Sequence, residues 1–95
     1  MKIIEGFKKL REDIFLRQFY ISGVRYIATD DFTSIVKNIG YDNNYVALAI
    51  YTYIINYANK YKTTVNLHGD NIFATNVDNI KKLLNRFESN IEDFK

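Results

Sequence analysis

The spacing of apolar residues changes along this chain from helical to strand-like and back, which limits the folds that it can adopt. Residues 2–16 carry an apolar side chain every three or four positions, which is the helical repeat. These side chains are Ile3, Phe7, Leu10 and Ile14. Residues 77–94 repeat the pattern behind Asn76, a residue type that caps helix starts. Their apolar stripe consists of Val77, Ile80, Leu84, Phe87, Ile91 and Phe94. The sequence therefore predicts a helix at each end.

A first strand-rich stretch follows the N-terminal helix. Residues 18–21 and 24–28 are rich in β-branched and aromatic side chains, which favour strands. They flank Ser22-Gly23, where the glycine can adopt the positive φ of a tight turn. We expect at least residues 24–28 to form a strand.

A second strand-rich stretch covers residues 63–75. Polar and apolar residues alternate over 63–67, and residues 68–71 contain the turn formers Gly, Asp and Asn. A hairpin with this four-residue turn pairs Val65 with Ala74 and Leu67 with Ile72. Both apolar pairs then fall on one face, which supports the hairpin.

Two more helices are expected between these strand-rich stretches. Thr29-Asp30-Asp31 predicts a helix start, because side-chain oxygens cap free amides and carboxylates suit the positive helix end. This helix covers residues 30–39 and ends at Gly40, the residue that most easily adopts the left-handed conformation. After a second cap at residues 42–44, a long helix covers residues 44–61.

Composition excludes several classes of protein. The chain has 95 residues, 47% of them hydrophobic, which suits one folded domain, here residues 1–95. It has no cysteine, so a disulfide framework, a thiolate zinc site and an iron–sulfur cluster are excluded. The apolar run of residues 45–55 is about half of the roughly 20 residues that a membrane span needs. Charged residues near the N-terminus argue against a secretory signal, so we expect a cytoplasmic protein.

No motif predicts catalysis, a metal or a cofactor. His68 is the one histidine and lies in a predicted turn. A lone histidine at such a place is more often a turn residue than a metal ligand. Helix capping explains the carboxylate pair Asp30-Asp31 without acid–base chemistry. The chain contains neither a zinc-protease motif nor a phosphate-binding glycine loop. We therefore expect a protein that is not an enzyme.

The order of predicted elements resembles a winged helix-turn-helix domain, an α/β (α+β) fold, with an added helix over 77–94. In this family, apolar or small residues stand at fixed distances from a glycine between two helices. The matching residues are Val36, Ile39, Gly40, Tyr41, Val46 and Ala49, and Ile35 adds to the pattern. The resemblance places the helix-turn-helix at about 30–61 and the wing at 63–75, and it implies binding of double-stranded DNA. An ordinary corner between two helices is the alternative.

The second helix of this unit departs from the family. It normally reads the major groove with Arg, Lys, Asn or Gln, yet residues 42–59 contain no Lys or Arg. Asp30 and Asp31 at the preceding helix start would also repel phosphates. We therefore expect this helix to form the core or the interface of a homodimer. The interface candidates are Tyr45, Leu48, Tyr51, Thr52 and Ile55.

Basic and polar residues elsewhere are the predicted DNA contacts. Lys and Arg neutralise phosphates, and Thr, Asn and Arg can read base edges. The candidates are Arg25, Lys37, Asn43, Asn44, Lys60, Lys62, Thr63, Thr64, Asn66, His68, Lys81 and Lys82, with Arg86 beside the last two. Two alternatives are open. Lys60 and Lys62 can serve only to stabilise a helix end, and Lys81, Lys82 and Arg86 can form an ordinary solvated helix face.

Size, element order and composition are similar to those of TcpK-like relaxosome accessory proteins of clostridial conjugative plasmids. Residues 23–31 and 39–43 are also similar to the start of phage antirepressor domains of the Bro-N type. The sequence thus predicts a homodimer that binds specific DNA sites for a mobile element, as a transfer accessory factor or a transcriptional regulator. Other proteins of a DNA-processing complex are further possible partners. The alternative is a winged helix that serves only for protein docking or for inhibition of a host enzyme.

Overall fold

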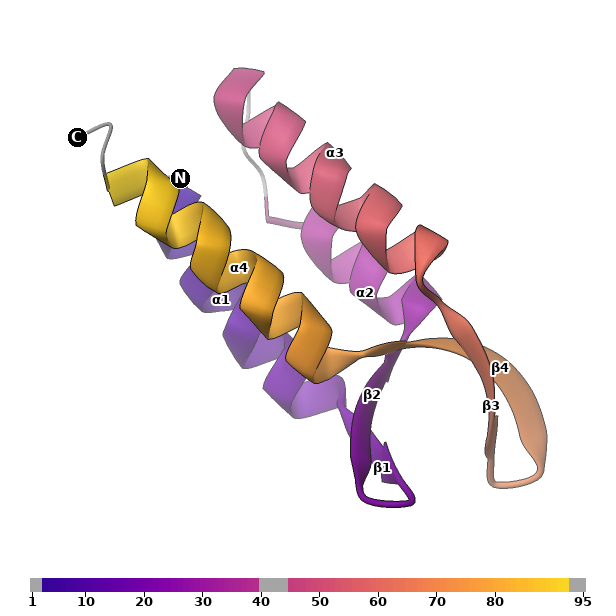
Figure 1. Cartoon of the computed structure of the whole chain (residues 1–95). Coiled ribbons are helices and arrows are strands. Elements are labelled where there is room, and N and C mark those ends of the chain that lie inside the picture. Colours follow the sequence, from indigo (N-terminus) through magenta and orange to yellow (C-terminus); the bar gives the residue numbers. More distant parts are fainter. Residues whose placement is uncertain (1–2, 40–44, 93–95) are drawn as a thin grey trace.

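Helices and antiparallel hairpins make up the part of the chain that the computed structural model describes, residues 3–39 and 45–92 (Figure 1). The helices are α1 (Ile3–Arg17), α2 (Thr29–Lys37), α3 (Tyr45–Lys60) and α4 (Val77–Glu92). The strands are β1 (Phe19–Ile21), β2 (Val24–Ala28), β3 (Thr63–Leu67) and β4 (Asp70–Asn76). The fold is therefore α+β, as the sequence predicted.

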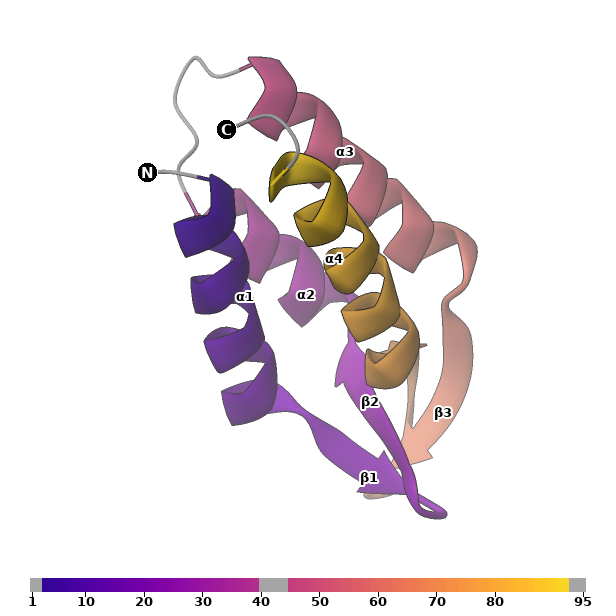
Figure 2. The same cartoon turned by 60° about the vertical axis from the view of Figure 1, so that its left-hand side comes forward.

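The helices and the hairpins occupy opposite ends of the molecule. α1 contacts α2 and α4, and α3 contacts the same two helices, so the four helices pack around one core. Both hairpins extend away from this bundle in the two views of Figures 1 and 2. The molecule is correspondingly elongated, with extents of 46 × 23 × 22 Å.

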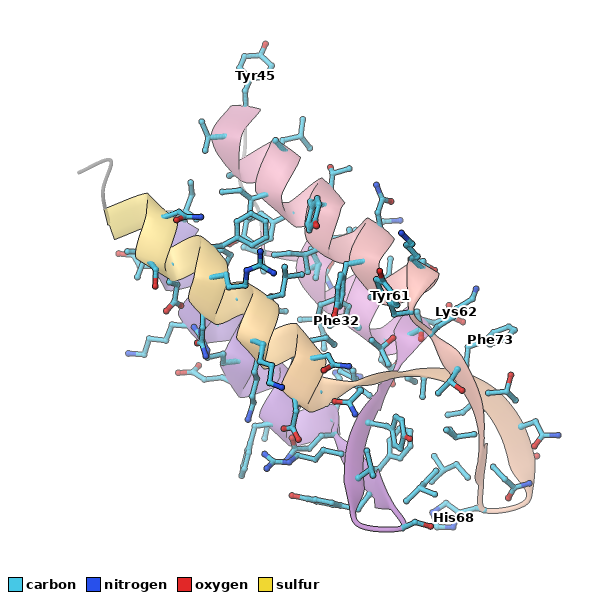
Figure 3. The ribbon with its side chains drawn as sticks, in the orientation of Figure 1. Phe32, Tyr45, Tyr61, Lys62, His68 and Phe73 are labelled. Carbon is cyan, nitrogen blue, oxygen red and sulfur yellow. The ribbon has the colours of Figure 1, made fainter. Side chains whose placement is uncertain are left out.

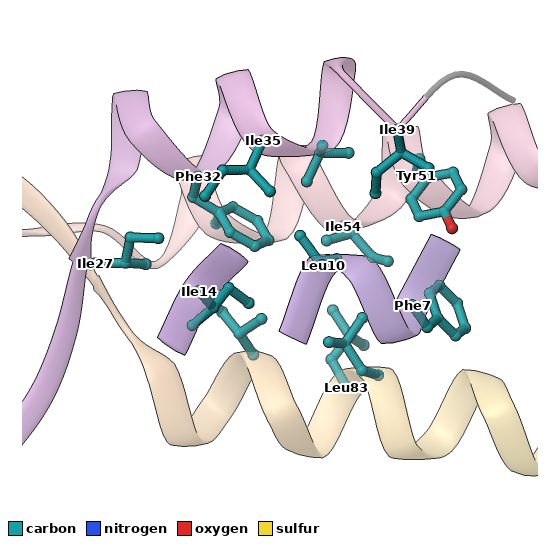
Figure 4. Packing of buried hydrophobic residues seen from close by; sticks show 14 of the residues in the cluster. Phe7, Leu10, Ile14, Ile27, Phe32, Ile35, Ile39, Tyr51, Ile54 and Leu83 are labelled. Carbon is teal, nitrogen blue, oxygen red and sulfur yellow. The ribbon is translucent and has the colours of Figure 1, made fainter. Parts of the chain in front are cut away.

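The core lies between the helices (Figure 4). The stripe predicted for the first helix supplies Phe7, Leu10 and Ile14, which are fully buried. α4 buries the first half of its predicted stripe, and Phe87 packs against the core edge. The first and last helices therefore turn the apolar faces that their spacing predicted toward the core.

Gly6 leaves room in α1 for the end of the Tyr51 side chain of α3. A Cβ at this position would collide with Tyr51 Oη and stand 3.0 Å from Ile39 Cγ2. The Tyr51 hydroxyl donates a hydrogen bond of 3.3 Å to the Ile3 carbonyl, and its ring meets Phe7 edge-on at 5.6 Å. Tyr51 thus anchors α3 against the first turns of α1.

The hairpins join edge to edge into one sheet with the strand order β1-β2-β4-β3. β2 pairs with β4 over a short stretch, with Ile27 opposite Thr75 and Ala28 opposite Ala74. The rest of each hairpin extends beyond this junction.

Both hairpins turn over two residues, which corrects one prediction. Ser22-Gly23 and His68-Gly69 have positive φ at both positions, the geometry that matches the twist of paired strands. Val65 therefore faces Ile72 rather than Ala74, and Leu67 faces Asp70. The register differs from the predicted one by two residues, so every side chain keeps its predicted face.

The predicted caps of two helices had opposite outcomes. Asn76 caps α4 as predicted, because its Oδ1 accepts a hydrogen bond of 3.1 Å from the Asn79 amide. The predicted side-chain cap of α2 was wrong, since the capping position is Ala28 and Thr29 is already helical. The predicted stop at Gly40 lies outside the described residues.

None of the helices in the described ranges has the length and apolar content required to cross a membrane.

Candidate nucleic-acid interface

The β3–β4 hairpin has one polar and one apolar face. Thr64 lies opposite Phe73 and Asn66 opposite Asn71, so these four side chains share a face, and all four are exposed. The other face carries Val65, Leu67 and Ile72, which are half-buried. Because successive residues of a strand alternate between faces, Thr63 belongs to this second face. The hydrogen-bonding face opposite the apolar residues was predicted, but Thr63 is not part of it.

Lys62 lies over the polar face. Its Nζ stands 4.4 Å from the centre of the Phe73 ring, and Phe73 is 56% exposed (Figure 3). An ammonium over an exposed aromatic face gains about 0.5–1 kcal/mol. The ring therefore holds a positive charge above the row of hydroxyl and amide groups. Lys60 makes a similar contact with Tyr61 at 5.4 Å, two residues earlier along the chain.

Hydrogen bonds fix the tip of this hairpin. Asn66 Oδ1 accepts a bond of 3.1 Å from the Gly69 amide, and Asn66 Nδ2 donates to Asn71 Oδ1 at 3.3 Å. Asn66 therefore holds the turn, and fewer of its polar groups are free for a ligand than the sequence suggested. His68 is exposed at the tip, at the far end of the hairpin from α3 (Figure 3).

A buried pair of threonines fixes the base of the hairpin. Thr75 Oγ1 donates a hydrogen bond of 3.2 Å to the Ala58 carbonyl in the last turns of α3. The Thr29 and Thr75 hydroxyl oxygens are 2.9 Å apart, and since the Thr75 proton points at Ala58, Thr29 is the donor. Both threonines are at most 2% exposed. They tie β4, α2 and α3 together and so set the direction of the hairpin.

A hollow of about 610 Å³ separates the polar face from the start of α2. Its lining includes Asp30 and Asp31 together with Thr64, Asn71 and Phe73. The carboxylates make this side of the face unfavourable for a phosphate. An anionic backbone would therefore pass on the side of Lys60 and Lys62.

The first hairpin carries a second pair of an aromatic ring and a cation. Arg25 lies 5.8 Å from the centre of the Tyr20 ring, opposite it in the register. Strand alternation places this pair on the same face of the sheet as Thr64 and Phe73. Ile27 between them is fully buried, so the two pairs are separate patches rather than one strip.

The other predicted DNA contacts do not join the hairpin face. Lys37 is the last residue of α2. The sheet is bound to the opposite end of that helix, where the Thr29 hydroxyl contacts Thr75. Lys82 and Arg86 are exposed on α4, and Lys81 lines a hollow of about 550 Å³ beside Arg11. Asn43 and Asn44 lie outside the described residues.

The residues predicted for a dimer interface divide into two groups. Tyr45, Leu48 and Thr52 are exposed, the first two by 83% and 45%. Tyr51 is 1% exposed and Ile55 packs against the core. Tyr51 is therefore a core residue of its own chain, which corrects its assignment to a surface, because its ring points between α1 and α3.

Sequence reasoning missed Phe73, Tyr20 and Asn71 as surface groups of the two hairpins. An aromatic residue in a strand usually belongs to the core. Phe73, however, stands at a polar position of the alternating pattern, and this alternation could have predicted its exposure. Within the described ranges, no group of three or more His, Asp or Glu side chains could hold a metal.

Comparisons of the chain with protein-family models, with curated proteins and with solved structures find no match.

Proposed function

We propose that this chain is a winged helix protein without catalytic activity that binds double-stranded DNA through its β3–β4 hairpin, the wing. The order of elements supports this assignment, because two helices, α2 and α3, lie between β2 and the wing, and β4 inserts beside β2. α1 precedes this unit, and α4 is the additional helix expected from the sequence.

One observation carries the proposal: Lys62 is held over Phe73 on an exposed face that also carries Thr64 and Asn71. Cations neutralise phosphates and supply most of the affinity, while hydroxyl and amide groups contact sugars or base edges. α3, the usual reader, contains no charged residue before Lys60. Its first 15 residues therefore offer no cation to the phosphates.

The biological setting that we propose is a mobile genetic element. The protein then acts in the cytoplasm as a homodimer, either as an accessory factor of plasmid transfer similar to the TcpK-like proteins or as a transcriptional regulator. An antirepressor of the Bro-N type belongs to the same setting. Duplex DNA that flanks the protein's own gene is the first probe to use, because such factors commonly bind nearby.

Fluorescence anisotropy with this duplex tests the proposal. Lys62→Ala should weaken binding several-fold and lower the slope of log affinity against log salt by about 1, as expected for one lost phosphate contact. Lys8→Ala is the matched control, because Lys8 is an exposed lysine of α1. Equal effects of the two variants, or tighter binding to single strands than to the duplex, would contradict binding of duplex DNA by the wing.

A protein-docking module is the second candidate, and the exposed apolar residues of α3 favour it. Val46 and Tyr53 are 60% and 55% exposed, in addition to Tyr45 and Leu48. If the protein binds no duplex from its genetic neighbourhood even at low salt, this second function replaces the first.

A further inference from the structure

The outward face of α3 is an uncharged stripe. Tyr45, Ala49, Tyr53 and Asn56 follow one another at spacings of four, four and three, and all are exposed. Ala47, Ile54 and Ala58 point the other way into the core. A stripe with two exposed tyrosines and an alanine between them is typical of a surface that binds a partner rather than one that faces solvent.

We infer that a second copy of the chain covers this stripe, in an antiparallel pair of α3 helices whose twofold axis passes beside Ala49. A twofold axis sets the stripe against the same stripe of the second copy, so a stripe of like charges would repel itself. α3 has no charge from Tyr45 to Asn59. Ala49 is the smallest residue at the middle of the exposed stripe and allows the closest approach of two helices.

A pocket between α3 and α4 provides the complementary shape. It has a volume of about 340 Å³, and its lining includes the apolar residues Ile50, Tyr53, Leu83 and Phe87 and the polar residues Arg86 and Asn90. The Tyr53 and Phe87 rings meet edge-on at 5.6 Å and stiffen its wall. An aromatic ring with a polar end suits such a pocket, because the ring is buried and the hydroxyl finds a hydrogen-bond partner.

Tyr45 of the second copy is the group that enters this pocket. It is 83% exposed and extends from the start of α3, away from the bundle (Figure 3). Tyr45 and Tyr53 are each four residues from Ala49, so the antiparallel arrangement sets Tyr45 of one copy against Tyr53 of the other. The arrangement repeats by symmetry and therefore closes into a dimer.

This dimer has a consequence for DNA, which rests on the proposed function. Lys60 stands 11 residues beyond Ala49 in α3. At about 1.5 Å per residue, the two Lys60 residues of the dimer lie about 33 Å apart along the paired helices. One turn of B-DNA is about 34 Å. Both Lys60 residues can thus reach phosphates on the same side of one duplex, one helical turn apart.

Disulfide trapping tests the pairing without DNA, and the native chain has no cysteine to interfere. Helix axes 8–10 Å apart leave about 3.4–5.4 Å between facing Cα atoms, and the upper part of this range suits a disulfide, whose Cα atoms lie about 4.4–6.8 Å apart. Ala49→Cys should therefore cross-link under mild oxidation. Asn56→Cys lies on the same stripe, but its symmetry mate is about 21 Å away, so it should not. Equal cross-linking of the two variants, or none with Ala49→Cys, would overturn the inference.

Sedimentation of the untreated protein gives a second readout. Tyr45→Ala should weaken dimerisation by at least about tenfold, because an aromatic anchor leaves its pocket. Tyr61→Ala removes another exposed tyrosine, just beyond the end of α3, and should leave the dimer unchanged. If both variants behave alike, Tyr45 is not the anchor and the inference is wrong.

Footprinting on the duplex separates this inference from the proposed function. Two protected regions about 10–11 base pairs apart are expected, and an insertion of half a turn between them should abolish joint binding. A trapped dimer that binds no duplex would refute the proposed function and leave the pairing intact. A protein that binds the duplex but gives no cross-link through Ala49→Cys would refute the pairing alone.

Discussion

The outward face of α3 and the outward face of the β3–β4 hairpin are both exposed, yet they carry opposite chemistry. The α3 face is uncharged and presents Tyr45, Leu48 and Tyr53. The hairpin face presents hydroxyl and amide groups beneath Lys62. In this chain, the surface suited to self-association and the surface suited to an anionic ligand are therefore separate elements. They are joined by Thr75 of β4, whose hydroxyl donates a hydrogen bond to the Ala58 carbonyl in the last turns of α3.

The largest expected effect is the difference in stability loss between substitutions on the buried and the exposed side of α3. Ile54→Ala removes a side chain that is 1% exposed and should lower the free energy of unfolding by about 2–5 kcal/mol. Leu48→Ala, at 45% exposure, should cost less than about 1 kcal/mol in the monomer. Urea denaturation at low protein concentration measures both. Similar losses would mean that the outer side of α3 also stabilises the isolated fold.

The link between the two regions is the next target. Thr75→Val keeps the shape of the side chain but leaves the Ala58 carbonyl and the Thr29 hydroxyl without their buried partner. Thermal or urea unfolding should show a loss of about 1–3 kcal/mol. Thr64→Val makes the same change at an exposed position of the neighbouring strand and should stay within about 0.5 kcal/mol. Equal losses would show that the buried threonines do not fix the hairpin.

Periodicity predicted the elements that frame this comparison. The α1 stripe, the long α3, the α4 cap at Asn76, the strand β2 and the β3–β4 hairpin follow from local spacing and from residues with strong local preferences. The polar face of the β3–β4 hairpin was predicted even with the wrong register, because a shift of two residues preserves alternation.

Tertiary contacts decided the points that the sequence missed. Thr29 was expected to cap α2, but its hydroxyl bonds to Thr75, a residue 46 positions away. Tyr51 was assigned to a surface, because nothing local reveals that Gly6 opens a site for its ring. The tight turn at His68-Gly69 places a non-glycine residue at positive φ, which only the Asn66 hydrogen bond and strand twist explain.

The smallest expected effect concerns the ring beneath the cation. Phe73→Ala removes the aromatic face under Lys62 and should weaken binding of duplex DNA by about two- to fivefold, the equivalent of about 0.5–1 kcal/mol. Phe15→Ala removes a similarly exposed ring from α1 and is the control. Anisotropy at fixed salt measures both. An effect of Phe15→Ala as large as that of Phe73→Ala would remove the special role of the hairpin.

An NMR titration with duplex DNA tests the division between the two faces most directly. Amide shifts of the labelled protein, followed as the duplex is added, map the contact surface in one experiment. This division predicts that the largest changes fall within Lys62–Phe73 and that the α3 residues Tyr45–Asn56 change little. Large changes along the outward face of α3, with the hairpin unaffected, would contradict it.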